Sequence, residues 1–314
     1  MKLATSTWVK VALIGLLCLG VCGWLGGCSR GMWFANSPLW PGGVLGCAGI
    51  NVMDGALSDL GRPGSYETTT EGTRFEADAS EVSAIELNWL AGSGYVWVAS
   101  DDETGGKVIV EETVRSGSCP VMVCEVEGGV LSVSYMEGNG GLSGCSQSWF
   151  GQKDLTVTVP ASLADQLELF ELEAASGRYT VEDLSCVELE MDVASGEANV
   201  TGVTAERASL SKASGRISLE GVVTDTVELD QASGATVLSF GTQAPSKVTG
   251  SSASGSVDLV LPVNTRVEAN VDKTTGSFAN NLGDGAGANG DADAPTCSLD
   301  FDILSGSFTV NPAE

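Results

Sequence analysis

The sequence predicts an all-β fold, a parallel β-solenoid or β-roll of about seven to eight coils. Two observations predict it. The dipeptide Ser-Gly, once replaced by Thr-Gly, stands eight times between two alternating apolar and polar runs, and from Ser176 onward the steps are 19, 19, 19, 21, 21 and 30 residues. Alternating apolar and polar residues flank each occurrence, which is the pattern of two half-buried strands. A period of about 20 residues is typical of coils that stack about 4.8 Å apart.

The repeat from Cys186 to Thr204 illustrates the pattern. Leu189, Met191 and Val193 alternate with polar residues before Ser195-Gly196, and apolar residues alternate again after it. Other repeats place apolar residues at the same offsets, and a shift of one residue would turn each set outward. We therefore expect parallel coils with an interior filled by side chains; a Greek-key sandwich is the alternative.

A glycine is expected at each bend between the two strands of a coil. Glycine adopts positive φ angles and lets backbones approach closely, which such a bend requires. These bends build the shape of the fold and are not predicted to carry chemistry. The expected turn glycines are Gly94, Gly177, Gly196, Gly215, Gly234, Gly255, Gly276 and Gly306.

An insert over residues 101–160 interrupts the spacing between the first two Ser-Gly occurrences. Strands are expected at 107–114, 121–126, 130–135 and 154–159, as antiparallel hairpins that cap or widen the first coils. Three cysteines lie in this insert and are more consistent with one disulfide than with a metal site, which would need a fourth soft ligand. They are Cys119, Cys124 and Cys145.

Two further cysteines, Cys186 and Cys297, fall in coils far apart, so each is predicted to be a single buried thiol. An acidic, glycine-rich loop at 281–296 explains the last, longer step of the repeat. It lacks the spacing of an EF-hand, so a solvated loop is expected and no metal site is assigned. The weak alternative is a calcium site formed by Asp284, Asp291 and Asp293.

Acidic residues also follow the outward side of the coils. In most neighbouring coils they alternate with serine, but Glu171 is expected beside Glu190, and Glu173 beside Asp192. Adjacent like charges on neighbouring strands are unfavourable. A solvated face explains these acids; a weak Ca²⁺ site or a site for a cationic polymer is the alternative.

The pattern of residues 1–29 indicates a membrane-targeting segment. Two lysines precede an uncharged stretch from Val11 to Ser29, long enough for a bilayer at about 1.5 Å per residue. Small residues before Cys28 also fit a lipoprotein signal, in which Cys28 becomes lipidated after cleavage. A lipoprotein, an uncleaved transmembrane helix and a free secreted protein remain open. Residues 30–80 are predicted to form a tether or to cover the first coil, and residues 81–314 the repeat domain.

Composition excludes several functions. The net charge of −26 repels phosphate backbones, so nucleic acid is not an expected partner. The absence of histidine removes the commonest general base and the usual activator of serine and cysteine nucleophiles. We therefore predict a non-enzymatic protein with no catalytic residue and no cofactor.

The Ser-Gly repeats, the preceding Leu155–Pro160 strand and the N-terminal apolar segment together resemble the putative-adhesin β-strand-repeat family of bacterial envelope proteins. The resemblance covers about residues 84–310 and implies a parallel β-solenoid on the cell surface. It also implies adhesion or envelope-stress signalling, and it offers no catalytic residues.

The expected function is adhesion or scaffolding by a solenoid anchored to the membrane through its N-terminus, with the repeats on the extracytoplasmic face of a bacterial cell. Its partner would be a cell-wall or host surface polymer. One alternative is envelope-stress sensing through a membrane signalling protein. A carbohydrate-active β-helix enzyme is the other, which the scattered lysines and arginines make less suitable.

Overall fold

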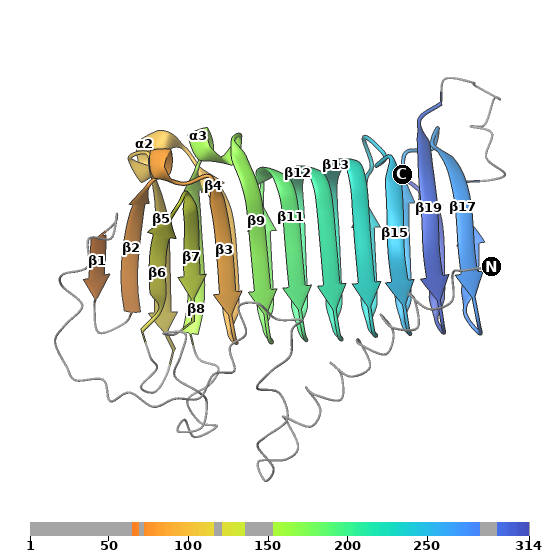
Figure 1. The fold of residues 1–314 in the computed structure, drawn as a ribbon, viewed down its shortest axis with the longest axis horizontal. Coiled ribbons are helices and arrows are strands. Elements are labelled where there is room, and N and C mark those ends of the chain that lie inside the picture. The colour runs from red at the N-terminus through yellow and green to blue at the C-terminus, as the bar shows by residue number, and fades with distance from the viewer. Residues whose placement is uncertain (1–64, 69–71, 116–120, 136–152, 283–293, 314) are drawn as a thin grey trace, which may run out of the picture.

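The computed structural model describes residues 65–68, 72–115, 121–135, 153–282 and 294–313, whose strands form one twenty-stranded sheet (Figure 1). Within these ranges the helices are single turns: α2 (Asp101–Thr104), α3 (Ala161–Ala164) and the 3-10 turn η1 (Ala79–Glu81). The prediction of an all-β fold is confirmed.

Nine parallel strands form the front ladder, which faces the viewer in Figure 1. In spatial order they are β7 (Val130–Ser134), β3 (Ala84–Trp89), β9 (Leu167–Ala174), β11 (Ser185–Val193), β12 (Glu197–Lys212), β13 (Arg216–Gln231), β15 (Lys247–Ser252), β19 (Thr296–Ile303) and β17 (Arg266–Lys273).

A second parallel ladder, the back ladder, lies behind the first. In spatial order it contains β8 (Lys153–Pro160), β4 (Ser93–Ala99), β10 (Arg178–Glu182), the first parts of β12 and β13, β14 (Ala235–Ser239), β16 (Ser256–Leu261), β20 (Ser307–Pro312) and β18 (Ser277–Asn280). Strands β12 and β13 join both ladders, and the register between them shifts at Thr201/Val203 and Ala205/Arg207, where the chain turns from the back to the front.

The core lies between the ladders because alternate side chains of both point inward. Leu172, Met191, Leu210 and Leu229 stand in one row on neighbouring front strands, and each is almost fully buried. Burial of one such side chain contributes about 1.5–3 kcal/mol. The repeated apolar positions therefore explain why the ladders pack against each other.

Six of the expected turn glycines have positive φ and stack on one another: Gly177, Gly196, Gly215, Gly234, Gly255 and Gly306. A Cβ on Gly215 would lie only 2.0 Å from the carbonyl oxygen of Gly196 in the next coil. The serine of the phrase also has a structural role: Ser195 Oγ donates to the carbonyl oxygen of Ala175, 3.1 Å away in the neighbouring turn.

The structure differs from the prediction at Gly94 and Gly276. Gly94 lies inside β4, and the turn position of that coil is occupied by Gly92, with φ of +114°. Gly94 stands opposite Tyr179, whose ring would be 2.6 Å from a Cβ there, so the tyrosine fills its space. Gly276 lies beside Gly306 but has no positive φ. It is the last glycine of the stack, so its turn packs against a neighbouring turn on one side only.

Antiparallel strands cover the N-terminal end of the ladders. They are β5 (Lys107–Val114), β2 (Gly72–Asp78) and β1 (Ser65–Thr68) beyond β8, and β6 (Val123–Glu127) beyond β7. We call these four strands the cap. The insert was expected to form antiparallel hairpins. Strands β6 and β7 do form one, but β7 and β8 also run parallel to β3 and β4 and extend the ladders. Strands β1 and β2 fall in the segment that the sequence assigned to the tether.

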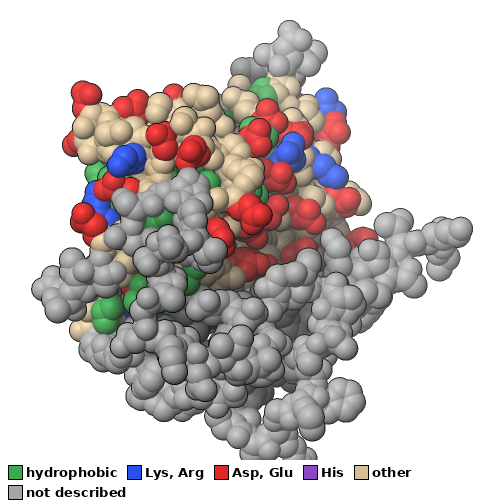
Figure 2. Space-filling view, turned by 60° about the vertical axis from the view of Figure 1, so that its left-hand side comes forward, with side chains coloured by type: hydrophobic (Ala, Val, Ile, Leu, Met, Phe, Trp, Pro, Cys, Tyr) green, Lys and Arg blue, Asp and Glu red, His purple; other side chains and the backbone are tan. Residues whose placement is uncertain are grey.

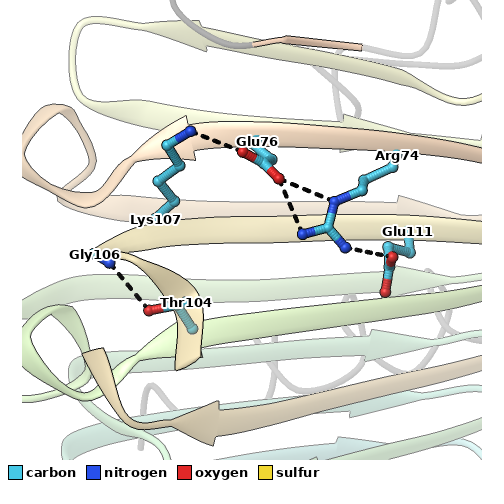
Figure 3. A network of polar contacts seen from close by, with 6 residues as sticks. All are labelled: Arg74, Glu76, Thr104, Gly106, Lys107 and Glu111. Carbon is cyan, nitrogen blue, oxygen red and sulfur yellow. Dashed lines mark hydrogen bonds and ion pairs between the residues drawn. The ribbon is translucent and has the colours of Figure 1, made fainter. Parts of the chain in front are cut away.

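Ion pairs hold the outer surface of the cap together (Figure 3). Arg74 lies between Glu76 and Glu111, with Nη1 2.6 Å from Glu111 Oε1 and Nη2 2.9 Å from Glu76 Oε1. Lys107 Nζ lies 2.8 Å from the other oxygen of Glu76. These contacts join β2 to β5.

A second ion pair is fully buried beneath the cap. Lys153 Nζ donates to Glu112 Oε2 at 2.8 Å and to the carbonyl oxygen of Tyr135 at 2.6 Å. The ammonium also lies 4.1 Å from the Tyr135 ring centroid and 5.1 Å from that of Trp89. One buried charge thus connects β3, β5 and β8 with Tyr135, the residue after β7.

The coils do not stack in chain order at the C-terminal end. Strands β19 and β20 insert between the coil of β15 and β16 and the coil of β17 and β18. Lys247 therefore has Ser298 beside it, and Glu268 lies one strand further.

The predicted membrane-targeting segment, including Cys28, lies outside the described residues, as does most of the predicted tether. Among the residues that are described, no helix has both the length and the apolar character of a membrane span.

Candidate binding surface

Two aromatic side chains stand on the outward side of the back ladder. Tyr95 and Trp97 occupy alternate positions of β4, between the inward residues Gly94, Val96 and Val98. Their rings are nearly parallel, with an angle of 14° and centroids 6.5 Å apart. The Tyr95 side of the pair is open to solvent, since this residue is 38% exposed, and Trp97 is half-buried. We call them the aromatic pair.

Rows of hydrogen-bonding side chains flank the aromatic pair. Thr156 and Thr180 lie on either side of Tyr95, and Asn199 follows Thr180 on β12. Beside Trp97 the same register places Glu182 and then Thr201. With neighbouring strands about 4.8 Å apart, these rows form a flat surface of hydroxyl, amide and carboxylate groups.

Glu182 fixes the position of one ring of the pair. Its Oε2 accepts a hydrogen bond of 2.5 Å from the Tyr95 hydroxyl. This hydrogen bond, together with burial and the charge of Glu182, raises the pKa of Tyr95. The tyrosine therefore stays protonated at neutral pH and keeps its orientation on the sheet.

A shallow groove of about 610 Å³ runs along the stacked glycine turns beside these rows. Its charged side chains are Arg178, Glu197 and Arg216, which occupy one register row. Arg178 Nε donates to Glu197 Oε2 at 3.1 Å. The groove thus adds cationic donors to the edge of the surface that carries the aromatic pair.

The outward side of the front ladder is acidic, as the sequence suggested, and Asp and Glu side chains gather over this part of the molecule in Figure 2. Glu86, Glu171 and Glu190 follow one another in one row, and Glu173 lies beside Asp192 in the next. We call these five residues the acidic cluster. Burial and the charges of Glu173, Glu190 and Glu86 raise the pKa of Glu171 to about 7.

Beyond the acidic cluster, neutral side chains separate the acids from β12 to β15. Ser211, Asp230 and Ser251 follow one another, and Ser251 Oγ donates to Asp230 Oδ1 at 2.6 Å. Within the described residues no group of three acidic, cysteine or histidine side chains has an arrangement that could hold a metal ion. The acidic cluster is thus a local concentration of repulsion beside a compensated stretch of the front ladder, and a second acidic pair, Asp302 beside Asp272, lies at the other end of that face.

The other predicted site residues divide into two groups. Cys119, Cys145, Asp284 and Asp291 lie outside the described residues, as does Asp293. Cys186 and Cys297 are free thiols in separate coils, as expected, but only Cys297 is fully buried and Cys186 is half-buried; desolvation raises the pKa of each to about 12. Cys124 is buried in β6.

Sequence reasoning did not single out the aromatic pair. The available signal was two large aromatic residues at positions i and i+2 in the polar phase of a strand, which places both outside the core. The repeated apolar register identifies only the inward residues of this strand, such as Val96, and carries no information on the side chains between them.

Solved structures of similar fold come from several bacteria. A putative adhesin from Bacteroides fragilis is 15% identical, with a TM-score of 0.45, over 75% of this chain and 95% of that one. A putative cell adhesion protein from Clostridium sporogenes is 12% identical, with a TM-score of 0.34, over 79% and 99% of the two chains. A putative lipid binding protein from Parabacteroides distasonis is 15% identical, with a TM-score of 0.33, over 77% and 96%.

No curated protein matches this sequence. A family model does: Toastrack DUF4097 matches residues 98–285, which is more than half of the chain. This match agrees with the resemblance to putative adhesins and covers most of both ladders and the cap strands β5 and β6; the aromatic pair and strands β1 and β2 precede it. The chain belongs to the Toastrack DUF4097 family.

Proposed function

We propose that this protein is a non-catalytic, adhesin-type surface protein that binds a neutral saccharide polymer across the back ladder. The observation that carries the proposal is the aromatic pair standing among rows of hydrogen-bonding side chains. In this proposal the two ladders act as a β-solenoid that holds the binding residues rigid.

The chemistry of a pyranose suits this surface. The C–H face of a sugar ring is apolar and packs on an aromatic ring, while its hydroxyl groups need donors and acceptors around the rim. Tyr95 and Trp97 supply the rings; Thr180, Asn199 and Thr201 supply the rim. Exposed Tyr and Trp side chains are also the residues that most often dominate binding energy at protein surfaces.

A polymer is favoured over a small ligand because the surface is open and long. The row through Tyr95 continues along successive strands to Ser218 and beyond, so several sugar units can lie across the ladder. Many weak contacts along one chain then add up through effective concentration. The net charge of −26 disfavours polyanions, so a neutral polymer suits this surface better than an anionic one.

The location is part of the proposal. Residues 1–29 would hold the protein in the membrane, as an uncleaved helix or through a lipid on Cys28, with the ladders outside the cell. Protease treatment of intact cells tests this directly: digestion of the repeats is expected, and their protection in intact but not lysed cells would contradict it.

Binding of the full chain to insoluble chitin, cellulose and peptidoglycan tests the function. Trp97→Ala and Tyr95→Ala should each weaken binding about tenfold, since each removes an aromatic contact at the centre of the site. The matched control is Thr309→Ala, on β20 in the same outward row but far from the pair. Wild-type affinity in both aromatic variants, or no binding by the wild type, would refute the proposal.

Envelope-stress sensing remains the alternative function. It predicts that deletion of the gene abolishes a stress-induced transcriptional response while Trp97→Ala leaves that response intact.

A further inference from the structure

The two ends of the sheet differ in the strands that cover them. At the N-terminal end the antiparallel strands of the cap lie beyond β8 and β7. At the other end, β17 pairs with β19 on one side and, within the described residues, with no strand on the other. An unpaired strand edge is a template for pairing with another chain.

The backbone groups available at this edge can be identified. The N–H of Arg266 donates to Pro295 O at 2.8 Å and that of Thr274 to Ile303 O at 2.9 Å. Because successive residues of a strand direct these groups to opposite sides, the even-numbered residues of β17 face β19. Val267, Ala269 and Val271 therefore direct their N–H and C=O groups to the open edge.

The same three residues occupy the inner row of the ladder. They stand beside Cys297, Leu299 and Phe301, all of which are buried. In contrast, Ala269 is exposed and Val271 half-buried, since β17 has the core on one side only. A strand added at this edge would extend the apolar core by another layer.

The side chains of β17 are self-complementary in one antiparallel register. If Ala269 of one copy lies opposite Ala269 of another, Val267 faces Val271 twice in the inner row. In the outer row Arg266 faces Asp272 twice, and Glu268 faces Asn270. Since the inner pairs carry the hydrogen bonds, the Arg–Asp pairs fall at the non-hydrogen-bonded positions, where side chains lie closer together.

Neighbouring registers are unfavourable. A shift of one residue would place inner side chains opposite outer ones. A centre at Glu268 places this glutamate opposite itself, and a centre at Asn270 places Glu268 opposite Asp272. In the single chain Arg266 pairs with Glu268 at 3.2 Å, with both side chains more than half exposed, so Arg266 is free to reach a second carboxylate.

We propose that β17 is a homodimer interface, at which two copies of this chain pair antiparallel about a two-fold axis at Ala269. The resulting sheet continues through both molecules and buries the open end of each core. The proposal does not depend on saccharide binding, and Trp97→Ala should leave dimerisation unchanged.

Cysteine cross-linking of the full chain tests the register. In a hydrogen-bonded antiparallel pair the Cα atoms lie about 5.5 Å apart, within the range of a disulfide. Ala269→Cys should therefore give a covalent dimer under mild oxidation. Wild type and Val263→Cys should give none, although Val263 is 62% exposed and more accessible to chance collisions.

Charge reversal tests the side-chain pairing. In the Ala269→Cys background, Arg266→Asp and Asp272→Arg should each slow cross-linking about tenfold, because each creates two like-charge pairs. The double reversal restores opposite charges and should restore the rate. No cross-link from Ala269→Cys, equal cross-linking from Val263→Cys, or insensitivity to Arg266→Asp would overturn the proposal.

Discussion

The cap and the repeat stack are stabilised in different ways. Strands β9 to β20, the repeat stack, contain the same inner rows and the same glycine turn coil after coil. The cap region depends on contacts that occur once, such as the buried pair of Lys153 and Glu112 and the surface pairs of Arg74. Repetition distributes stability over many equivalent contacts, whereas the cap concentrates it in a few.

This difference has a mechanical basis. A coil in the stack contacts only its two neighbours, so a defect there is expected to remain local. The ammonium of Lys153 instead contacts the cap and the ladders at once. It binds Glu112 in the cap, and it also contacts Tyr135 and the ring of Trp89 at the end of the front ladder. Loss of this one group should therefore release the cap from the ladders as a unit.

The largest effect should come from breaking the buried ion pair. Glu112→Ala leaves the ammonium of Lys153 buried with a carbonyl oxygen but without its carboxylate, at a cost of about 3–5 kcal/mol. Chemical denaturation followed by circular dichroism measures the free energy of unfolding. The double variant Lys153→Met, Glu112→Leu removes both charges and should recover most of the loss. A loss below about 1 kcal/mol in the single variant would show that the pair does not hold the cap.

A change at a turn glycine tests the repeat stack. Gly215→Val places a Cβ 2.0 Å from Gly196 O at φ of +94°, so we expect a loss of about 2–4 kcal/mol. The matched control is Gly105→Ala, at φ of +63° with no atom within 4 Å of the added Cβ, which should cost about 1 kcal/mol. Equal losses in both variants would mean that φ alone, and not the close stacking of turns, makes glycine necessary.

Hydrogen exchange sharpens the comparison between the two regions. In Gly215→Val, faster exchange should be confined to the coils next to Gly215, because each layer contacts only its neighbours. In Glu112→Ala it should extend over β2, β5 and β8 together. Global acceleration in the glycine variant would contradict the local behaviour of the stack.

The smallest effect concerns pH and the acidic cluster. The pKa of Glu171, raised to about 7, means that the folded protein binds this proton more tightly than the unfolded chain. The resulting stabilisation is complete below about pH 4.5 and is lost as pH rises through 7. Because the side chain is partly solvated, we expect about 1 kcal/mol. Glu171→Gln should flatten this slope, whereas Glu228→Gln, with neutral Ser209 and Thr249 beside it, should not.

The repeated part of the fold was predictable because its signals are local. Positions such as Met191 and Leu210 recur at one spacing, and only one register buries both. The adjacency of Glu171 and Glu190 follows from the same spacing and appears in the strand pairing. Once the period is known, neighbours in space can be read from the sequence as far as β16, where the coils stack in chain order.

What the sequence did not predict depends on contacts outside the period. Gly94 carries the repeat phrase, yet the ring of Tyr179 from the next coil decides that it lies in a strand. Strands β1 and β2 precede the repeats and pair antiparallel, so they share no spacing with them. The binding role proposed for Tyr95 and Trp97 follows from their outward position, which a search for buried residues overlooks.

The insertion of β19 and β20 between two earlier coils has a consequence for the newly made chain. Coils up to β16 can pack onto one another in the order in which the ribosome produces them. Strands β17 and β18 cannot, since the layer on which they rest is made of residues 296–312, which come after them in the chain. They must wait until those residues have been synthesised, so a polypeptide truncated before residue 296 leaves β17 and β18 without the layer that holds them.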